Sequence, residues 1–286
     1  MTLAVLAIFV FARCTPSPPT PLDTEDPRDT EVVEQVHHEE ASLTLSVRRV
    51  EQPGWSGRAV VATVTAGPRR HVRVVPAPRP APLAEIIASD SPPQPFAAIN
   101  GGFYETDGTP MGLVRAGGHD AHAADPRGGS GILVVERGLP RIVYADDYEP
   151  SASITDGLQS IDRLVDSGAS LVSPRASRRR AARSAVALDR HGALHLVVAF
   201  DDRAVGRETE SRIELAEDAT RTGPTIAQMA ELLMRAPADG GVGAVQALGL
   251  DGGFSTSLLV KSASGSLSVV AFHATINGLL VSVNDE

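Results

Sequence analysis

The sequence holds a single cysteine, Cys14, so the chain cannot form an internal disulfide. Aromatic residues are also scarce, at 4% of the 286 residues. Positive charge is in the minority, and the formal net charge of −9 argues against nonspecific binding to nucleic acid. An anionic ligand would therefore need a local cluster of positive side chains. With 42% hydrophobic residues, the chain can still bury the core of one large domain or two small ones.

The chain begins with a short apolar run, residues 1–13, that ends just before Cys14. The run is too short to span a membrane comfortably and is typical of the core of a signal peptide. The segment after it is rich in proline, threonine and acidic residues, which predicts an unfolded, extended tether. We therefore expect a leader (1–14), a disordered tether (15–40) and one folded domain (41–286).

The order of apolar run, cysteine and tether resembles the leader of a bacterial lipoprotein, with Cys14 as the lipidated residue. That resemblance implies an exported protein that is periplasmic, an outer-membrane lipoprotein attached through Cys14, or secreted. Two features depart from it, because no lysine or arginine precedes the run and Arg13 replaces the usual small residue. An ordinary signal peptide and a wrongly assigned start are the alternatives.

Short strands joined by hairpins dominate the expected domain. Alternating or continuous apolar residues predict strands in SLTLSVRRV, RAVVATVTAG and HVRVVPA. Hairpins are predicted over 131–144, with a turn near Arg137–Gly138, and over 184–200, with a turn from Asp189 to Gly192. About ten or more strands and two or three helices are expected. This balance predicts an α+β, β-rich mixed domain with hairpin-connected sheets and a few packed helices.

Three segments are expected to be helical. Thr225 and Gln228 have the spacing of a capping box. The apolar residues that follow fall on one stripe of a helix, namely Ile226, Met229, Ala230 and Leu233. A proline-bounded segment predicts a helical stretch over 83–88, and Asp156 is placed to cap a short helix over 157–168.

Three apolar strands directly adjoin small and polar residues at one of their ends, a pattern that suits a ligand site. The first ends at Asn100, and the second begins near Ser184, next to Arg183. A guanidinium held by packing at the start of a strand suits a phosphate. The third strand runs into a carboxylate, two glycines and three hydroxyl residues: Asp251, Gly252, Gly253, Ser255, Thr256 and Ser257. A tight turn is the alternative at each glycine pair, since Asp-Gly is a common hairpin signal.

Other polar residues are weaker candidates. His119 and His122 lie near two aspartates, Asp120 and Asp125, but a glycine-rich loop without helical spacing favours solvated residues over a metal site. We expect no metal and no cofactor. Ser184 has no neighbouring histidine in a recognisable elbow, so a serine hydrolase is a poor fit. Four further arginines crowd the loop before Arg183, and most of them are expected to be solvated: Arg175, Arg178, Arg179 and Arg180.

Five sequence blocks occur in the order found in the phosphodiester glycosidase domain family: AINGGFYETDGTPMGLV, LQSIDRLVDSG, ARSAVALDRHGALHLVV, GPTIAQMAELL and ALGLDGGFSTSLLV. The chain resembles this family over about residues 95–283, and the combination of blocks is specific although each alone is weak. The resemblance implies a mixed α/β domain built on β-sheet. It also implies hydrolysis of a sugar-1-phosphodiester, which releases the sugar from the phosphate.

The resemblance implies roles for particular residues. Arg183 is expected to bind the phosphodiester, with Asn100 and the glycine amides sharing its oxygens. Asp251 is expected to act at the anomeric carbon as an acid/base or as a nucleophile. Ser255 or Thr256 would orient Asp251 or a sugar hydroxyl. The remaining expected substrate contacts are Gly101, Gly102, Gln159, Gly252 and Gly253.

The chain departs from the family pattern at three places. Phe254 stands where a third glycine is usual, and Ile161–Asp162 replaces a common Gly-Pro pair, which adds a negative charge near the expected phosphate site. The usual Arg-Pro before the last strand is replaced by FHATINGLLV. Phe254 and Asp162 favour an alternative, a catalytically weak envelope protein that binds a glycan or phosphoglycan. In both cases the expected partner is a carbohydrate phosphodiester and not nucleic acid.

Overall fold

The computed structural model describes residues 34–40, 42–90, 92, 96–173, 176 and 178–283. The expected leader with Cys14, residues 15–33 of the expected tether, and Arg175 lie outside these ranges. Within them, no helix is long and apolar enough to cross a membrane. Residues 34–40, which we expected in the disordered tether, form an edge strand, β1 (Glu34–Glu40), that pairs with the next strand along the chain.

Three β-sheets make up most of the fold. The eight-stranded sheet has the order β1, β2 (Leu43–Gln52), β3 (Trp55–Val64), β14 (Leu194–Phe200), β13 (Arg183–Asp189), β17 (Ala244–Gly249), β11 (Asp162–Asp166) and β12 (Ala169–Ser170). The seven-stranded sheet has the order β15 (Val205–Thr209), β16 (Arg212–Leu215), β19 (Gly265–Val270), β18 (Leu258–Ser262), β5 (Phe96–Asn100), β20 (Thr275–Val283) and β4 (Arg70–Ala81). The five-stranded sheet has the order β7 (His119–His122), β6 (Val114–Ala116), β10 (Ile154–Ser160), β8 (Gly131–Glu136) and β9 (Leu139–Tyr144).

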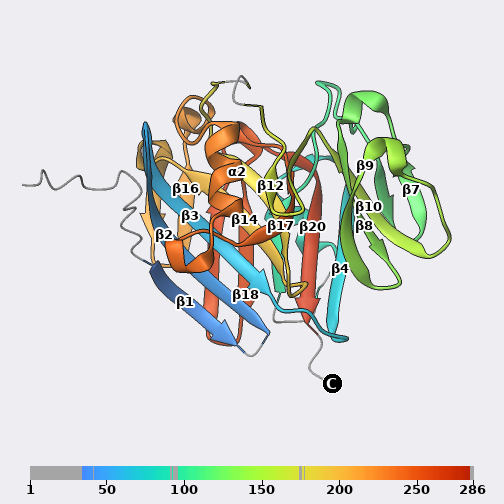
Figure 1. The fold of residues 1–286 in the computed structure, drawn as a ribbon, viewed down its shortest axis with the longest axis horizontal. Coiled ribbons are helices and arrows are strands. Elements are labelled where there is room, and N and C mark those ends of the chain that lie inside the picture. The colour runs from blue at the N-terminus through green and yellow to red at the C-terminus, as the bar shows by residue number, and fades with distance from the viewer. Residues whose placement is uncertain are drawn as a thin grey trace, which may run out of the picture.

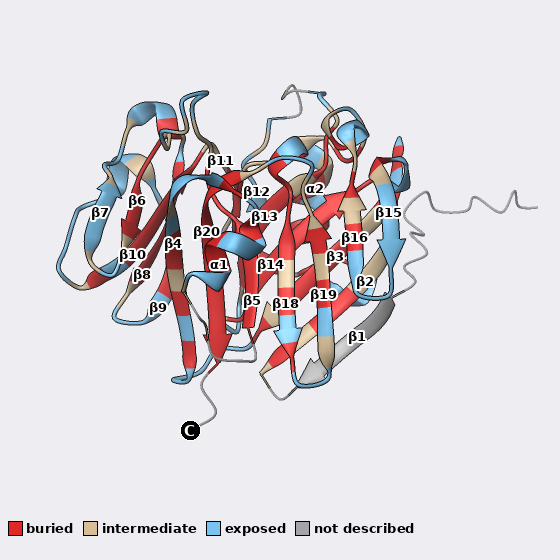
Figure 2. Ribbon diagram, turned by 180° about the vertical axis from the view of Figure 1, so that it is seen from behind, coloured by how far each residue is buried: buried red, intermediate tan, exposed pale blue. Residues whose placement is uncertain are grey.

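The largest hydrophobic core joins the three sheets. It takes residues from β2, β3, β13 and β14 on one side and from β5, β18 and β20 on the other, together with residues of β8 and β10. Strands at the centre are mostly apolar because both of their faces are covered, as in β14 and β20, where every residue is buried. Figure 2 shows this gradient, with buried central strands and exposed edges and loops.

Each large sheet carries one α-helix on its outer face. Helix α2 (Ile226–Met234) packs on the eight-stranded sheet, where its buried residues join Trp55, Val61 and Val197 in a second core (Figure 1). Helix α1 (Leu83–Ala88) packs on β4, β5 and β20 of the seven-stranded sheet (Figure 2). Six short 3₁₀ turns complete the described elements: Pro126–Gly128, Ala145–Asp147, Asp202–Ala204, Glu217–Thr220, Pro237–Asp239 and Gly253–Ser255.

Local predictions agree with the structure in two helices and both hairpin turns. The capping box of Thr225 and Gln228 is formed, and α1 covers the predicted 83–88. Arg137 and Gly138 both have positive φ, as the turn between β8 and β9 requires. The β13–β14 turn lies at Asp189–Gly192, as predicted.

The predicted helix over 157–168 is wrong. Residues 154–160 form β10 and residues 162–166 form β11, which pairs with β17. Asp156 does not cap a helix, because its carboxylate accepts a hydrogen bond from the Val74 amide at 2.9 Å in a buried position. Tertiary pairing with β8 and β17 overrides a local pattern that fits a helix equally well.

Strand ends from both large sheets meet at one place. Strand β5 ends at Asn100, opposite the beginnings of β18 and β20 in the seven-stranded sheet. In the eight-stranded sheet, β17 ends beside the beginnings of β13 and β11, since Gly249 is paired with both Ala185 and Asp162. The three polar segments singled out in the sequence therefore come to the same end of the fold.

Candidate active site

Asn100 connects the two large sheets through its side chain, which is fully buried. Its Oδ1 accepts hydrogen bonds from the Ser184 hydroxyl at 2.7 Å and from the Ser257 amide at 3.0 Å. Its Nδ2 donates to the main-chain carbonyl of Asp251 at 2.7 Å. Asn100 therefore positions the loop that carries Asp251, and its amide is already engaged within the protein.

Asp251 follows β17 and is fixed by its main chain. Its amide donates to the Gly101 carbonyl at 3.0 Å, and the Leu250 amide before it donates to the Ser184 carbonyl at 2.8 Å. Burial raises the pKa of the Asp251 carboxyl to about 6, although hydrogen bonds from the Ser255 side chain and the Gly252 amide oppose the shift. A carboxyl of this kind exchanges its proton near neutral pH, which suits general acid/base chemistry.

Tyr104 lies beside Asp251 and Ser255, and we call these three residues the Asp251 cluster. No sequence argument singled out Tyr104. Its hydroxyl donates to the Ala274 carbonyl at 2.9 Å. Burial raises the pKa of the Tyr104 phenol, the Asp251 carboxyl raises it further, and a hydrogen bond with the Ser255 side chain lowers it. These interactions place Tyr104, Ser255 and Asp251 together. The only signal in the sequence was that Tyr104 lies four residues after Asn100, within the same motif.

The glycines of the two motifs lie against protein backbone and side chains. A Cβ on Gly101 would come within 1.7 Å of Asn277 Oδ1, and one on Gly102 within 2.6 Å of the Gln159 carbonyl. A Cβ on Gly252 would approach the Ala182 carbonyl at 2.8 Å. Gly253 has a φ of +59°, in the left-handed region. In this structure the glycines allow close packing of protein segments and a tight turn, one of the two explanations considered from the sequence.

Two buried polar atoms near these motifs have no hydrogen-bond partner among the described residues. They are the hydroxyl of Thr256 and the Nδ2 of Asn277. The Oδ1 of Asn277 accepts from the Gly102 amide at 2.9 Å, so the side chain is fixed while its amino group stays unpaired. Buried polar groups are rarely left unpaired, and a bound ligand or water would satisfy them.

Gln159 is buried beneath a neighbouring loop and uses its whole amide within the protein. Its Oε1 accepts from the amides of Leu113 and Asp125 at 3.0 and 3.2 Å, and its Nε2 donates to the carbonyls of Asp125 and Gly129 at 2.8 and 3.0 Å. These four bonds fill the donor and acceptor capacity of the side chain. Gln159 therefore holds the loop in place.

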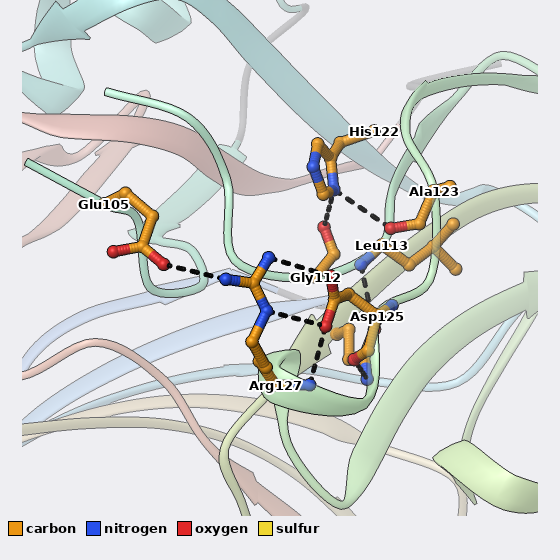
Figure 3. A network of polar contacts seen from close by, with 8 residues as sticks. Glu105, Gly112, Leu113, His122, Ala123, Asp125 and Arg127 are labelled. Carbon is orange, nitrogen blue, oxygen red and sulfur yellow. Dashed lines mark hydrogen bonds and ion pairs between the residues drawn. The ribbon is translucent and has the colours of Figure 1, made fainter. Parts of the chain in front are cut away.

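Of the residues considered as a metal site, only Asp125 lies in the loop held by Gln159. His119, Asp120 and His122 lie in strand β7, where Asp120 pairs with Arg115 at 2.6 Å. Figure 3 shows Arg127 between Glu105 and Asp125, with Arg127 Nη2 at 3.0 Å from Asp125 Oδ2. His122 Nδ1 lies 3.0 Å from the Gly112 carbonyl and 2.9 Å from the Ala123 carbonyl. No group of three potential metal ligands occurs among the residues that the structure describes.

Arg183 lies on the opposite face of β13 from Ser184, because side chains alternate along a strand. Its Nη2 donates to the Arg179 carbonyl at 2.8 Å and its Nε to the Pro224 carbonyl at 3.3 Å. These are main-chain groups outside the Asp251 cluster. The backbone of Arg183 is nevertheless close to the motif, since a Cβ on Gly252 would lie 3.7 Å from Arg183 Cα.

Asp162 is the carboxylate that acts on Arg183. Burial lowers the pKa of the Arg183 guanidinium, and the Asp162 charge raises it. Burial likewise raises the pKa of Asp162, and the Arg183 charge opposes that shift. The charge of each group thus offsets part of the pKa shift that burial causes in the other. The acidic residue at this position is therefore an electrostatic partner of the arginine.

The sequence profile of the phosphodiester glycosidase family matches residues 94–281. The chain belongs to this family. Its fold is similar to the catalytic domain of zebrafish N-acetylglucosamine-1-phosphodiester α-N-acetylglucosaminidase, auto-inhibited by its pro-peptide, with a TM-score of 0.60, 16% identity and coverage of 89% of this chain and 88% of that one. A hypothetical protein from Synechocystis is similar at a TM-score of 0.56 and 16% identity, covering 88% of this chain and 64% of that one.

At this level of identity, the likeness to the solved structures shows the fold alone. The chain spans a little less than two thirds of the Synechocystis protein. No curated protein sequence gives a significant match. Membership of the family supports the activity of a glycosyl phosphodiester hydrolase in general. A more specific statement about the substrate depends on the residues of the site.

Proposed function

We propose that this protein is an exported hydrolase that cleaves a sugar-1-phosphodiester bond in an envelope or extracellular glycan. The observation that carries the proposal is the environment of Asp251, a desolvated carboxyl beside Ser255 and Tyr104 at the end of β17. The family match supports the reaction class, and the resemblance of residues 1–14 to a lipoprotein leader supports export. The bond broken is the one between the anomeric carbon and the phosphate oxygen, and water supplies the new hydroxyl.

Asp251 acts at the anomeric carbon in this proposal. As a general acid it would protonate the departing oxygen, and as a nucleophile or base it would act in its ionised form. A pKa of about 6 makes both forms accessible near neutral pH. Ser255 or Thr256 would orient Asp251 or a sugar hydroxyl in this proposal.

Arg183 is proposed to bind the phosphate of the diester from a position outside the Asp251 cluster, where its guanidinium contacts the carbonyls of Arg179 and Pro224. Its two hydrogen bonds to carbonyls use two of five donors and leave the others for phosphate oxygens. The negative charge of Asp162 works against a phosphate at this position, because like charges repel. That repulsion is the observation that favours the second candidate function, a glycan-binding envelope protein with weak or no turnover.

The experiment is to incubate the purified protein with the methyl phosphodiester of α-N-acetylglucosamine 1-phosphate and to measure free sugar. Release by the wild type, and its loss in Asp251→Asn and Arg183→Ala, is the expected result. Asp146→Asn is the matched control, since Asp146 is exposed in the turn Ala145–Asp147. Binding without release over hours would favour the glycan-binding alternative, and full activity in Asp251→Asn would remove that residue from the mechanism.

A further inference from the structure

A cavity of about 380 Å³ opens beside the beginning of β11. Its described lining includes no residue of the Asp251 cluster, so it is separate from that part of the candidate site. Leu171, Val172 and Ile226 form its apolar wall, and Asp162 and Arg163 bring two opposite charges to it. Such a lining suits a ligand with a short apolar part and a charged end.

Arg163 already has partners for its charge. Its Nη2 lies 2.6 Å from Asp166 Oδ1, and its guanidinium lies 3.8 Å from the centroid of the Tyr144 ring. The side chain of Arg163 is also only 5% exposed. The charge that the cavity offers to a ligand is therefore that of Asp162.

Asp162 has no direct partner for its carboxylate. Among the residues that the structure describes, none donates a hydrogen bond to this carboxylate or lies within ion-pair distance of it. Burial raises the pKa of the carboxyl, and the Arg183 charge offsets only part of that shift. Because Asp162 is half-buried and lines the cavity, a ligand there can contact it. A partly desolvated carboxylate without a donor is unfavourable, and a cationic ligand would compensate its charge.

Arg183 lies on the same face of the sheet as Asp162, across the end of β17. Gly249 of β17 is paired with Asp162 on one side and with Ala185 on the other, and Ala185 shares a face with Arg183. A Cβ on Gly249 would lie 3.5 Å from the Asp162 Cβ, which places Asp162 on that face as well. The strand between the two charges therefore contributes no side chain that separates them.

The cavity and Arg183 are also linked through the start of α2. The Arg183 Nε donates to the Pro224 carbonyl at 3.3 Å, and Ile226, two residues later, lies in the cavity wall. A ligand whose phosphate lies on the guanidinium has the cavity and its carboxylate beside it. A positive Arg183 next to a negative Asp162 complements a phosphate that is joined to an ammonium group.

We propose that the cavity binds a short aminoalkyl group esterified to the phosphate of the substrate, with its ammonium group on Asp162. The substrate class is then a sugar-1-phosphate diester of an amino alcohol such as 2-aminoethanol. The inference rests on the proposed function, in which Arg183 binds the phosphate. The methylene groups of the chain contact Leu171 and Val172. The ammonium group compensates the carboxylate that would otherwise repel the phosphate.

The test compares the 2-aminoethyl and 2-hydroxyethyl diesters of α-N-acetylglucosamine 1-phosphate, which have the same size and differ in charge. For the wild type we expect a KM about five- to tenfold lower with the aminoethyl diester, the effect of one partly solvated hydrogen bond between charged groups. In Asp162→Asn the ratio of the two KM values should approach one, because the variant loses both the attraction for the amine and the repulsion of the uncharged diester. Asp239→Asn removes an exposed carboxylate in the turn Pro237–Asp239 and should keep the wild-type ratio. An equal KM for both diesters in the wild type would overturn the inference and leave the proposed function intact.

A binding measurement that needs no turnover separates this inference from the proposed function. Calorimetric titration with 2-aminoethyl phosphate and with 2-hydroxyethyl phosphate should show tighter binding of the amine by the wild type and equal binding by Asp162→Asn. If no diester is hydrolysed, that result would still support the inference. A preference for the amine that persists in Asp162→Asn would overturn it, because the amine would then bind elsewhere. Sedimentation with vesicles of phosphatidylethanolamine but not of phosphatidylcholine, abolished in Asp162→Asn, would assign the cavity to a lipid headgroup and overturn its assignment to the substrate.

Discussion

Replacing the Asp251 carboxyl by an amide should make the protein less sensitive to pH. The unfolded chain ionises this group near the ordinary value of 3.8, whereas in the folded protein burial raises its pKa to about 6. A group with a raised folded pKa binds its proton more tightly in the native state. Its contribution to stability is therefore fully present below pH 3.8 and is lost as the pH rises through 6.

The size of the effect follows from the shift. Two pKa units correspond to about 3 kcal/mol, since each unit is worth about 1.4 kcal/mol. Part of that loss has already occurred at pH 4, so the wild type should lose about 2 kcal/mol between pH 4 and pH 7.5 through this group alone. Asp251→Asn keeps the shape of the side chain and cannot ionise, so the variant should not show this loss.

The assay is urea unfolding of both proteins at pH 4 and pH 7.5, followed through the fluorescence of Trp55. This residue is the only tryptophan in the chain, and its side chain is buried. The difference in unfolding free energy between variant and wild type cancels the titration of all other groups. It should change by about 2 kcal/mol in favour of the variant at pH 7.5.

Asp146→Asn is again the control, because it removes an exposed carboxyl from a turn and should follow the wild type at both pH values. A difference in unfolding free energy between Asp251→Asn and the wild type that is the same at both pH values would contradict the raised pKa of Asp251. It would mean that Asp251 is well solvated in the folded protein, and its assignment as a proton-exchanging group near neutral pH would be lost.

Three further outcomes are expected. The pH profile of kcat/KM should bend near pH 6, falling above it if Asp251 is the general acid and rising if it is the nucleophile; a profile flat from pH 5 to 8 would exclude both roles. Asp162→Asn should lower the KM for a phosphodiester about fivefold by removing about 1 kcal/mol of repulsion near Arg183, whereas a higher KM in steady-state kinetics would show that Asp162 positions the arginine. Asn100→Ala should lower the free energy of unfolding by at least about 2 kcal/mol in urea titrations, because it leaves buried groups unpaired. An unchanged urea midpoint would show that the Asn100 hydrogen bonds do not hold the two sheets together.

Elements formed by local interactions could be predicted from the sequence. The capping box at Thr225 and Gln228 predicted where α2 begins, because an N-cap and its partner lie within one turn of helix. Alternating apolar residues predicted β-strands, and glycine at a turn predicted the hairpin at Gly138. The order of the family's blocks predicted membership of the family, which the match over residues 94–281 confirms.

The sequence was ambiguous for residues whose structure depends on interactions with distant parts of the chain. Residues 157–166 fit a helix locally, yet pairing with β8 and β17 makes them strands. Gln159 fits a substrate contact in a motif, whereas its position under a loop fills all its hydrogen bonds. Tyr104 stood out by no pattern, since only the folded chain brings it to Ser255 and Asp251.

Tertiary structure alone decided the electrostatics of the site. The pKa of Asp251 depends on how much water the surrounding segments exclude, and those segments come from distant parts of the chain. The effect of the Asp162 charge on Arg183 likewise arises because β11 and β13 begin on either side of the end of β17. Desolvation and charge act through space, so residue order sets which groups are available and the fold sets how strongly they act.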